Sequence, residues 1–421
     1  MVIGVRKAVR ALGGEGMKVL KGIKLGIRLP LMLVAISVVA LAIMGVSSYG
    51  VARKILTSEG TDRLQQSLDT RVGTLGAWAA GLTSDLHATA SNAGTVRALR
   101  EFSAAWDRLG ETPQDDLRKA FIEANPNPPA ERYKLDYPGE VNDYTILHRR
   151  YHPGFVALAE QKHLVDIYLV SVTGSVIYSL NKQDDFATNL REGAAQDSPL
   201  AQVVAAAQAA TGEAPVVSDF IRDPGAPGAP EVVFLARPLR STEGLLLGVL
   251  VFKASAAPLS AIMADPRALG QTGQGYVVGA DMMLQSTLRS APAKGAPDVQ
   301  TPAVERALAG QSGHVVEAGI NGAEVMAVFA PFTLFGRTYA AVVEQSTREL
   351  FEPARALARQ LTLNGTMLLV LLGGLSAWMA RSVSKPLGRL TGTIGTISEG
   401  VYDAGVRDGE RGDEIGDIAR A

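Results

Sequence analysis

Two long stretches without a charged residue constrain this chain more than any other feature. Residues 360–380 would span roughly 32 Å as a helix at about 1.5 Å per residue, which matches the hydrocarbon core of a bilayer. Residues 29–52 are also free of charge and follow residues 1–28, a segment with seven Lys or Arg against one acidic residue. Both stretches therefore predict transmembrane helices. A 47% hydrophobic composition over 421 residues agrees with a membrane protein that has a large soluble part.

The basic residues predict the orientation of the chain. Each apolar stretch has its basic flank on the side away from residues 53–359, so the positive-inside rule places both termini in the cytoplasm and this long segment outside. A cleaved signal peptide is the alternative for the N-terminus, because Ala40-Leu41-Ala42 resembles a cleavage site, but the apolar run continues past it. Met17 is an alternative start to Met1, since the basic flank survives without the preceding residues.

The absence of cysteine limits the compartment and the chemistry. An external segment without disulfides fits a bacterial periplasmic domain that is large enough to bury its own cores. We therefore expect the protein in the inner membrane of a bacterium. Cysteine metal sites and thiol chemistry are excluded.

The segment after the second apolar stretch, residues 381–421, has the pattern of a small coiled-coil domain. Pro386 opens a stripe of apolar residues at spacings of three and four, which is typical of a helix that packs against partner helices. The stripe consists of Leu387, Leu390, Ile394 and Ile397. The chain then breaks at Glu399-Gly400 and restarts at Asp413-Glu414-Ile415-Gly416.

This arrangement of helix, glycine-containing connector and second helix resembles a HAMP domain. In that family two chains form a parallel four-helix coiled coil that receives movement from a membrane helix. The resemblance implies a homodimer, and it implies that the domain is incomplete at Ala421. It assigns signal relay to Pro386, Leu390, Ile394 and Glu414.

The external segment predicts a long helix followed by two similar sets of strands. Apolar residues at intervals of three and four predict one helix from Arg53 to about Phe102, and a second helix is expected at 144–162 with an interruption at Pro153-Gly154. Each set then has two strands, a helix and three strands. The first set covers 164–172, 175–180, 198–210, 216–221, 231–239 and 245–252, and the second covers 275–279, 284–288, 301–309, 313–316, 324–331 and 337–344.

Two antiparallel sheets of this order, between two membrane helices, resemble the double Cache sensor domain, whose modules are PAS-like. The resemblance implies a distal module at about 103–258 and a proximal module at about 265–346. Gly270-Gln271-Thr272-Gly273 and the strand after it look like the proximal module of bacterial chemoreceptors, and residues 184–190 look like the distal module of one group of them. Asp281-Met282-Met283 departs from the usual Asp-Gly turn. The predicted fold class is α+β.

No pattern in the sequence predicts an enzyme, a metal site or a cofactor. His148 and His152 have the i, i+4 spacing of a zinc pair, but no Glu accompanies them and Pro153 follows, which favours a helix end. The glycines of 270–279 precede a strand and lack a Lys-Ser/Thr pair, so a phosphate loop is excluded. Asp184-Asp185 is interpreted as a solvated loop and not as a catalytic carboxylate pair.

The candidate ligand-binding residues lie in the distal set of strands. Tyr168 and Tyr178 occupy the two strands of the first hairpin, and Arg237 stands in an otherwise apolar strand, where it could bind a carboxylate in bidentate fashion. The alternative is an edge strand, marked by Pro238, in which Arg237 faces water. Asp219 could bind a ligand amine or could simply end a strand at the surface.

These features together resemble a bacterial methyl-accepting chemotaxis receptor, truncated before its signalling domain. The resemblance implies that the external domain binds a small molecule and that HAMP passes the signal to a cytoplasmic kinase and adaptor. The lipid bilayer and a second copy of the chain are the other expected partners, and no nucleic acid is expected. The alternative is the sensory half of a membrane histidine kinase or nucleotide cyclase, which shares the same input parts.

Overall fold

The computed structural model describes residues 25–139, 141–212, 214–223, 231–289, 298–399, 405 and 409–421. The predicted basic N-terminus lies outside these residues except for its last few positions. The chain divides into two units. Residues 61–349 form one, here called the sheet unit, and the described residues up to Gly60 together with residues 350–421 form the other, here called the helical unit.

The long helix predicted from Arg53 to about Phe102 begins earlier in the chain, at Leu25, and also ends earlier, at Ser91. Helix α3 (Leu25–Ser91) runs without a break from the first apolar stretch into the sheet unit. It ends because Asn92 caps a new helix, α4 (Ala93–Arg108), and accepts a hydrogen bond from the backbone N–H of Gly94 at 2.7 Å. The single helix predicted to Phe102 is therefore two helices.

The first sheet has five strands in the order β2-β1-β5-β4-β3, all antiparallel. Its strands are β1 (Leu164–Ser171), β2 (Val176–Ser179), β3 (Val216–Val217), β4 (Val232–Arg240) and β5 (Leu246–Ser255). The predicted hairpin and the two long strands are confirmed. Residues 218–221 were expected in a strand but contribute only an isolated bridge, Ile221 to Val232.

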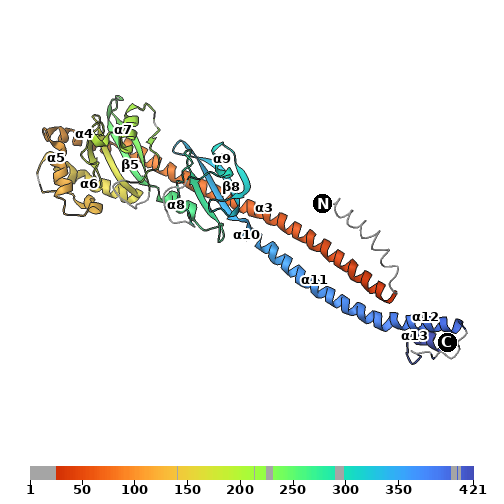
Figure 1. The fold of residues 1–421 in the computed structure, drawn as a ribbon. Helices are drawn as coiled ribbons and strands as arrows, with labels where there is room; N and C mark the ends of the chain where they lie inside the picture. The colour runs from red at the N-terminus through yellow and green to blue at the C-terminus, as the bar shows by residue number, and fades with distance from the viewer. Residues whose placement is uncertain are drawn as a thin grey trace. The chain divides into compact units, whose positions relative to one another are not determined.

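Helices cover both faces of this sheet (Figure 1). One face carries α7 (Pro199–Ala209), which begins at its predicted cap because the Ser198 hydroxyl accepts from the N–H of Ala201. The other face carries α4 and α6 (Asp143–Lys162). The interruption predicted in α6 is absent, since Pro153 lies inside the helix on its exposed side. The short helices α5 (Pro113–Arg118), η2 (Lys119–Glu123) and η3 (Pro129–Lys134) were not predicted.

The second sheet has four strands in the order β6-β9-β8-β7, again antiparallel. They are β6 (Gln274–Val278), β7 (Gly313–Ala318), β8 (Glu324–Leu334) and β9 (Arg337–Ser346), flanked by α8 (Ala257–Ala264) and α9 (Pro302–Leu308). The strand predicted at 284–288 is wrong, because Leu284 makes one isolated bridge to Val278. This is where the Asp-Gly turn is missing from the sequence.

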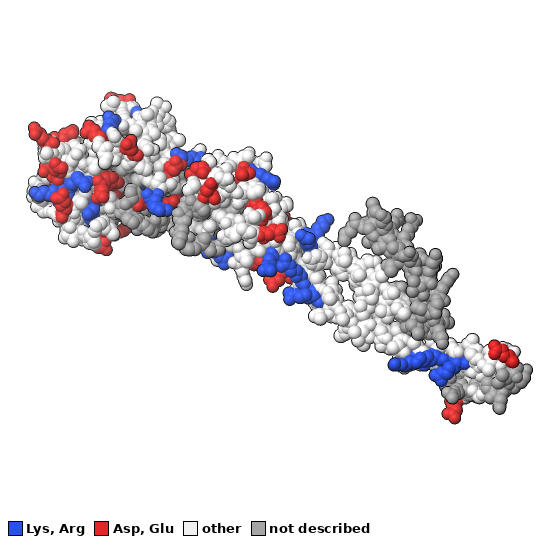
Figure 2. Space-filling model, in the orientation of Figure 1, with Lys and Arg blue, Asp and Glu red and all other residues white. Residues whose placement is uncertain are grey.

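The helical unit contains the C-terminal elements and the first part of α3. Its helices are α11 (Glu352–Met379), a π-turn η5 (Ala380–Ser384), α12 (Lys385–Ser398) and α13 (Glu414–Arg420), and α10 (Thr347–Leu350) leads into it. Among the residues that the structure describes, two helices are long and apolar enough to cross a membrane, one in α3 from Leu31 and one from Glu352. Their apolar side chains face outward, and Lys and Arg gather at the ends of the uncharged stretch (Figure 2). Lipid would cover these side chains.

Candidate functional site

A β-bulge separates the two tyrosines that the sequence places together. The pairing of β1 with β2 shifts between Leu169 and Val170, so that Leu169 lies opposite Tyr178 while Val170 lies opposite Val176. Because of this extra residue, Tyr178 does not share the face of Val176. Tyr168 packs in the core under α7, whereas Tyr178 contacts aromatic rings from α4 and α6. One ligand cannot touch both rings from one side of the sheet.

Five polar side chains gather at one end of the α7 face, here called the polar cluster: Asp166, Tyr168, Asp185, Asp223 and Lys253. The Tyr168 hydroxyl donates to Asp185 Oδ2 at 2.9 Å, and the Lys253 ammonium lies 2.8 Å from Asp223 Oδ2. The Lys253–Asp223 pair is buried, with both side chains at most 7% exposed. Asp166 lies directly across the β1–β5 ladder from Lys253.

The polar cluster contains more carboxylates than Lys253 can neutralise, and its electrostatics reflect this. Burial, and then the neighbouring charge of Asp185, raise the pKa of Asp166 to about 7. Burial also raises the pKa of Asp185. Asp166 accepts from the backbone N–H groups of Ile167 and Leu180, each at 2.7 Å, whereas the buried Asp185 Oδ1 has no hydrogen-bond partner among the described residues. This oxygen can accept a hydrogen bond from a bound molecule.

The α4 and α6 face holds a cluster of aromatic and imidazole rings around Tyr178. The rings of His148 and His152 stack at 4.3 Å and are both fully buried. His148 Nδ1 lies 2.8 Å from the carbonyl oxygen of Asp136, and no described residue forms a hydrogen bond with His148 Nε2. His152 accepts from the Tyr178 hydroxyl at 2.7 Å. Burial, and then the charge of Lys182, lower the pKa of both imidazoles and so favour their neutral form. The two histidines lie in the core, where the sequence indicated a helix end.

Lys182 is buried against the same rings. Its ammonium lies 4.6 Å from the ring centre of Tyr178, 5.1 Å from that of Phe186 and 5.5 Å from that of Phe121, and it donates to the carbonyl of Ser179. Burial lowers the pKa of Lys182 to about 7, although Asp166 acts in the opposite direction. The residue has φ +52°, a left-handed conformation that costs energy for a side chain of this kind.

The other two predicted ligand residues lie away from the polar cluster. Asp219 is exposed and forms an ion pair with Arg337 of the second sheet. Arg237 is half buried and lines an open groove of about 650 Å³ together with α3 residues such as Ala80 and His87. Arg237 follows Ala236, which packs under α7, so it points to the opposite face. The structure therefore does not bring the four predicted residues into one site.

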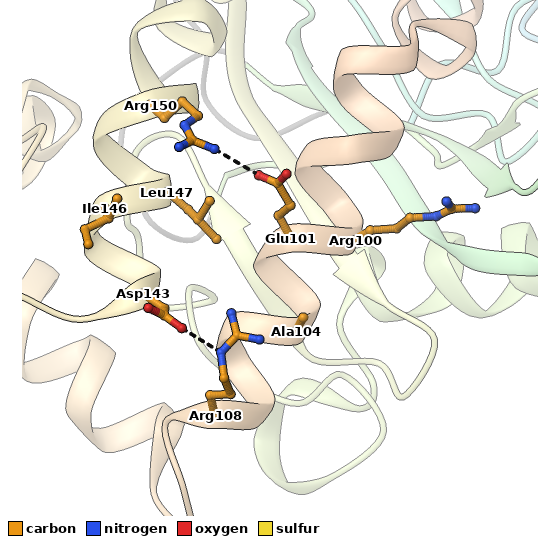
Figure 3. Close-up of a pocket in the computed structure, with 8 residues that line it drawn as sticks. All are labelled: Arg100, Glu101, Ala104, Arg108, Asp143, Ile146, Leu147 and Arg150. Atoms are coloured by element: carbon orange, nitrogen blue, oxygen red, sulfur yellow. Dashed lines mark hydrogen bonds and ion pairs between the residues drawn. The ribbon is translucent and has the colours of Figure 1, made fainter.

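A second groove, of about 420 Å³, lies between α4 and α6 on the surface (Figure 3). Two ion pairs cross it, Arg108 with Asp143 at 2.7 Å and Arg150 with Glu101 at 3.5 Å. Figure 3 shows Arg100 directed away from these pairs. The charged groups inside the groove are already paired and half exposed, so it offers less to a ligand than the polar cluster does.

Sequence reasoning missed most of the polar cluster, although a signal was present. Asp166 and Lys253 are single charges inside the apolar strands LVDIYLVS and LLGVLVFKAS. Charged residues are rarely buried without a partner, so such a pair in neighbouring strands indicates a polar site. Asp185 was interpreted as part of a solvated loop, but its contact with Tyr168 corrects this.

The predicted relay residues occupy the C-terminal helices. Pro386 and Leu390 are buried, whereas Ile394 is 58% exposed and Glu414 is exposed at the start of α13. Gly416 packs on the chain itself, since a Cβ there would lie 2.0 Å from the carbonyl oxygen of Arg411. This close approach explains the glycine of the Asp-Glu-Ile-Gly motif.

Residues 378–421 match the family model of the HAMP domain. This segment is a HAMP domain. The resemblance predicted for residues 381–421 is thereby confirmed, with a start three residues earlier. Leu387 and Ile394, two residues of the apolar stripe of α12, are exposed.

Solved structures similar to the chain include sensory domains. The ligand-binding domain of the Pseudomonas aeruginosa PAO1 amino acid chemoreceptor PctB with L-Arg is 15% identical, with a TM-score of 0.42, over 75% of this chain and 98% of that one. The sensory domain of the Campylobacter jejuni chemoreceptor Tlp3 with isoleucine is 11% identical, with a TM-score of 0.40, over 72% and 98%. The extracellular domain of a proposed histidine kinase, vpHK1S-Z8, is 13% identical, with a TM-score of 0.37, over 64% and 96%. No curated protein matches the chain.

Proposed function

We propose that this protein is a transmembrane receptor of the chemotaxis type, which binds a small molecule outside the cell and signals through its HAMP domain. The observation that carries the proposal is a continuous helical path from the second apolar stretch into the HAMP domain. Helix α11 begins three residues after the last residue of the sheet unit, contains the second apolar stretch, and continues into η5 and the HAMP helix α12. A displacement of α11 would therefore be passed directly to the HAMP helix, and the sheet unit precedes α11 in the chain.

The polar cluster is our proposed ligand site. Within the part of the chain that the structure describes, no group donates a hydrogen bond to Asp185 Oδ1, and Tyr168 and Lys253 offer polar contacts on an otherwise apolar face. A small polar molecule with a donor group would satisfy this oxygen. A ligand shifts the receptor between two states only by binding one of them more tightly, so the buried charges of the cluster supply the difference in affinity.

The orientation predicts the outcome of reporter fusions. Alkaline phosphatase is active only outside the cytoplasm, so we expect activity when it is fused after Ala210 and none after Ala421. Activity only in the second fusion would reverse the proposed topology. Activity in both would require an even number of crossings, none or two, between the two points, against the single crossing proposed.

The HAMP domain predicts a homodimer. The chain has no cysteine, so Ile394→Cys introduces a single thiol into the exposed stripe of α12. In membranes of the full chain, mild oxidation is expected to join two copies through this position. Thr391→Cys, on an exposed position outside the stripe, is the matched control and should crosslink several-fold less. Equal crosslinking of both variants would contradict a specific parallel dimer.

A thermal-shift screen of the full chain in lipid nanodiscs tests the ligand site. Amino acids, organic acids and amines are the probes, and a bound compound raises the unfolding temperature. We expect Asp185→Asn to weaken this shift and Arg237→Ala, which changes the open groove, to leave it intact. Loss of the shift in Arg237→Ala alone would place the ligand in that groove.

The alternative function is the sensory half of a membrane histidine kinase or nucleotide cyclase. Such proteins share these sensor and HAMP parts, so the screen for a ligand applies to them equally.

A further inference from the structure

Glu349, the last residue of the sheet unit, binds the loop that precedes β6. Its Oε1 accepts from the backbone N–H of Gln271 at 2.8 Å, and its Oε2 accepts from the N–H of Thr272 at 2.8 Å and from the Thr272 hydroxyl. Burial raises the pKa of this carboxyl, but the hydrogen bonds from Thr272 and Gln271 outweigh burial and lower the pKa to about 2. The carboxylate is therefore charged at physiological pH, and the contact is a charge-assisted one.

The loop is shaped to present its N–H groups to this carboxylate. Gly270 has φ +69°, and a Cβ there would lie 2.3 Å from Glu349 Oε1. Arg289 holds the loop from the other side, because its guanidinium donates to the carbonyls of Gly270 at 2.9 Å and Gly273 at 3.2 Å. A left-handed glycine followed by two free N–H groups is an anion-binding arrangement of the backbone.

The same carboxylate is linked to α3. Gln345, at the end of β9, is buried and donates a side-chain hydrogen bond to Glu349. Its Oε1 accepts from the guanidinium of Arg63, which lies on α3. One network, Arg63–Gln345–Glu349–Thr272, thus joins the helix that enters the sheet unit to the chain segment that leaves it.

We infer that Glu349 is a latch, which fixes the exit of the sheet unit to the 270–273 loop and whose release alters the packing of the HAMP domain. The position supports this, because α10 ends one residue later and α11 begins at Glu352. Any movement of the second sheet against the loop reaches α11 through only two intervening residues, Leu350 and Phe351. The inference rests on the proposed function, since it needs α11 to transmit a signal across the membrane.

Amide exchange tests the contact itself. Glu349→Gln keeps the size of the side chain, but its amide nitrogen cannot accept from Thr272. In the full chain in lipid nanodiscs we expect the amides of Gln271 and Thr272 to exchange about tenfold faster, with β6 to β9 still protected. Glu305→Gln, which removes an exposed carboxylate from α9 of the same sheet, is the control and should change neither amide. Unchanged exchange in Glu349→Gln would overturn the latch.

Crosslinking tests the coupling. Each latch variant is combined with Ile394→Cys, and we expect Glu349→Gln to change the yield of crosslinked dimer at least twofold relative to Glu305→Gln. Gly270→Ala, whose Cβ forces Glu349 away from the loop, should act in the same direction. Faster exchange with an unchanged yield would reduce the contact to a structural one and overturn the relay role. Failure of the proposed function looks different, because Ile394→Cys alone would then give no crosslink.

Discussion

Asp223→Asn is expected to lower the unfolding temperature of the full chain by roughly 6–20 °C. The substitution removes the carboxylate that pairs directly with the buried Lys253 ammonium, and removing one partner of a buried pair costs about 3–5 kcal/mol. A domain of this size shifts by about 2–4 °C for each kcal/mol. Thermal unfolding in lipid nanodiscs, followed by circular dichroism, measures the change.

Asp219→Asn is the matched control, because Asp219 also forms an ion pair but is exposed, with 68% of its side chain accessible. Exposed pairs contribute about 0–1 kcal/mol, so the control should shift by at most about 4 °C. The double variant Asp223→Leu/Lys253→Met removes both charges and should recover most of the loss. Equal shifts for Asp223→Asn and Asp219→Asn would show that the buried pair is not the source of the effect.

Helices and strands were predicted correctly where the local sequence pattern and the tertiary packing favour the same structure. Ser198 and Thr301 cap the two short helices as predicted, and the strands of the second sheet lie within a few residues of their expected limits. The failures have a common physical cause. A cap at Asn92 divides a helix whose apolar periodicity continues unchanged, and Pro153 is tolerated because it lies on the exposed side of α6.

The candidate site was less predictable than the fold, because strand register decides which side chains meet. The bulge beside Leu169 moves Tyr178 to the face opposite Tyr168, and nothing in the sequence marks this extra residue. Asp223 lies in a loop far along the chain from Lys253, so their contact depends on tertiary structure alone. The HAMP domain was predictable because its motif residues lie within one short segment.

The buried histidines predict that acid destabilises the sheet unit. Burial, and then the charge of Lys182, lower the pKa of His152 to about 3, and burial lowers the pKa of His148 well below its usual value. Between about pH 3 and pH 6.5 the unfolded chain therefore binds more protons at these positions than the folded chain does. Stability is full above pH 6.5 and is lost as the pH falls, by up to about 1.4 kcal/mol per pH unit for each histidine.

Asp166 acts in the opposite direction, so the measurement must be a difference between variants. Its raised pKa, about 7, means that the folded state binds its proton first and gains stability as the pH falls from 7 toward 4. His148→Phe removes one titrating imidazole, and its ring suits the neighbouring Phe121 and Tyr144. From pH 7 to pH 5 we expect this variant to lose about 1–2 kcal/mol less than the wild type, measured by chemical unfolding. His87→Gln, on the exposed side of α3, should follow the wild type. An identical pH profile for all three proteins would mean that the folded chain protonates His148 as readily as the unfolded chain does, which its contacts with Lys182 and His152 oppose.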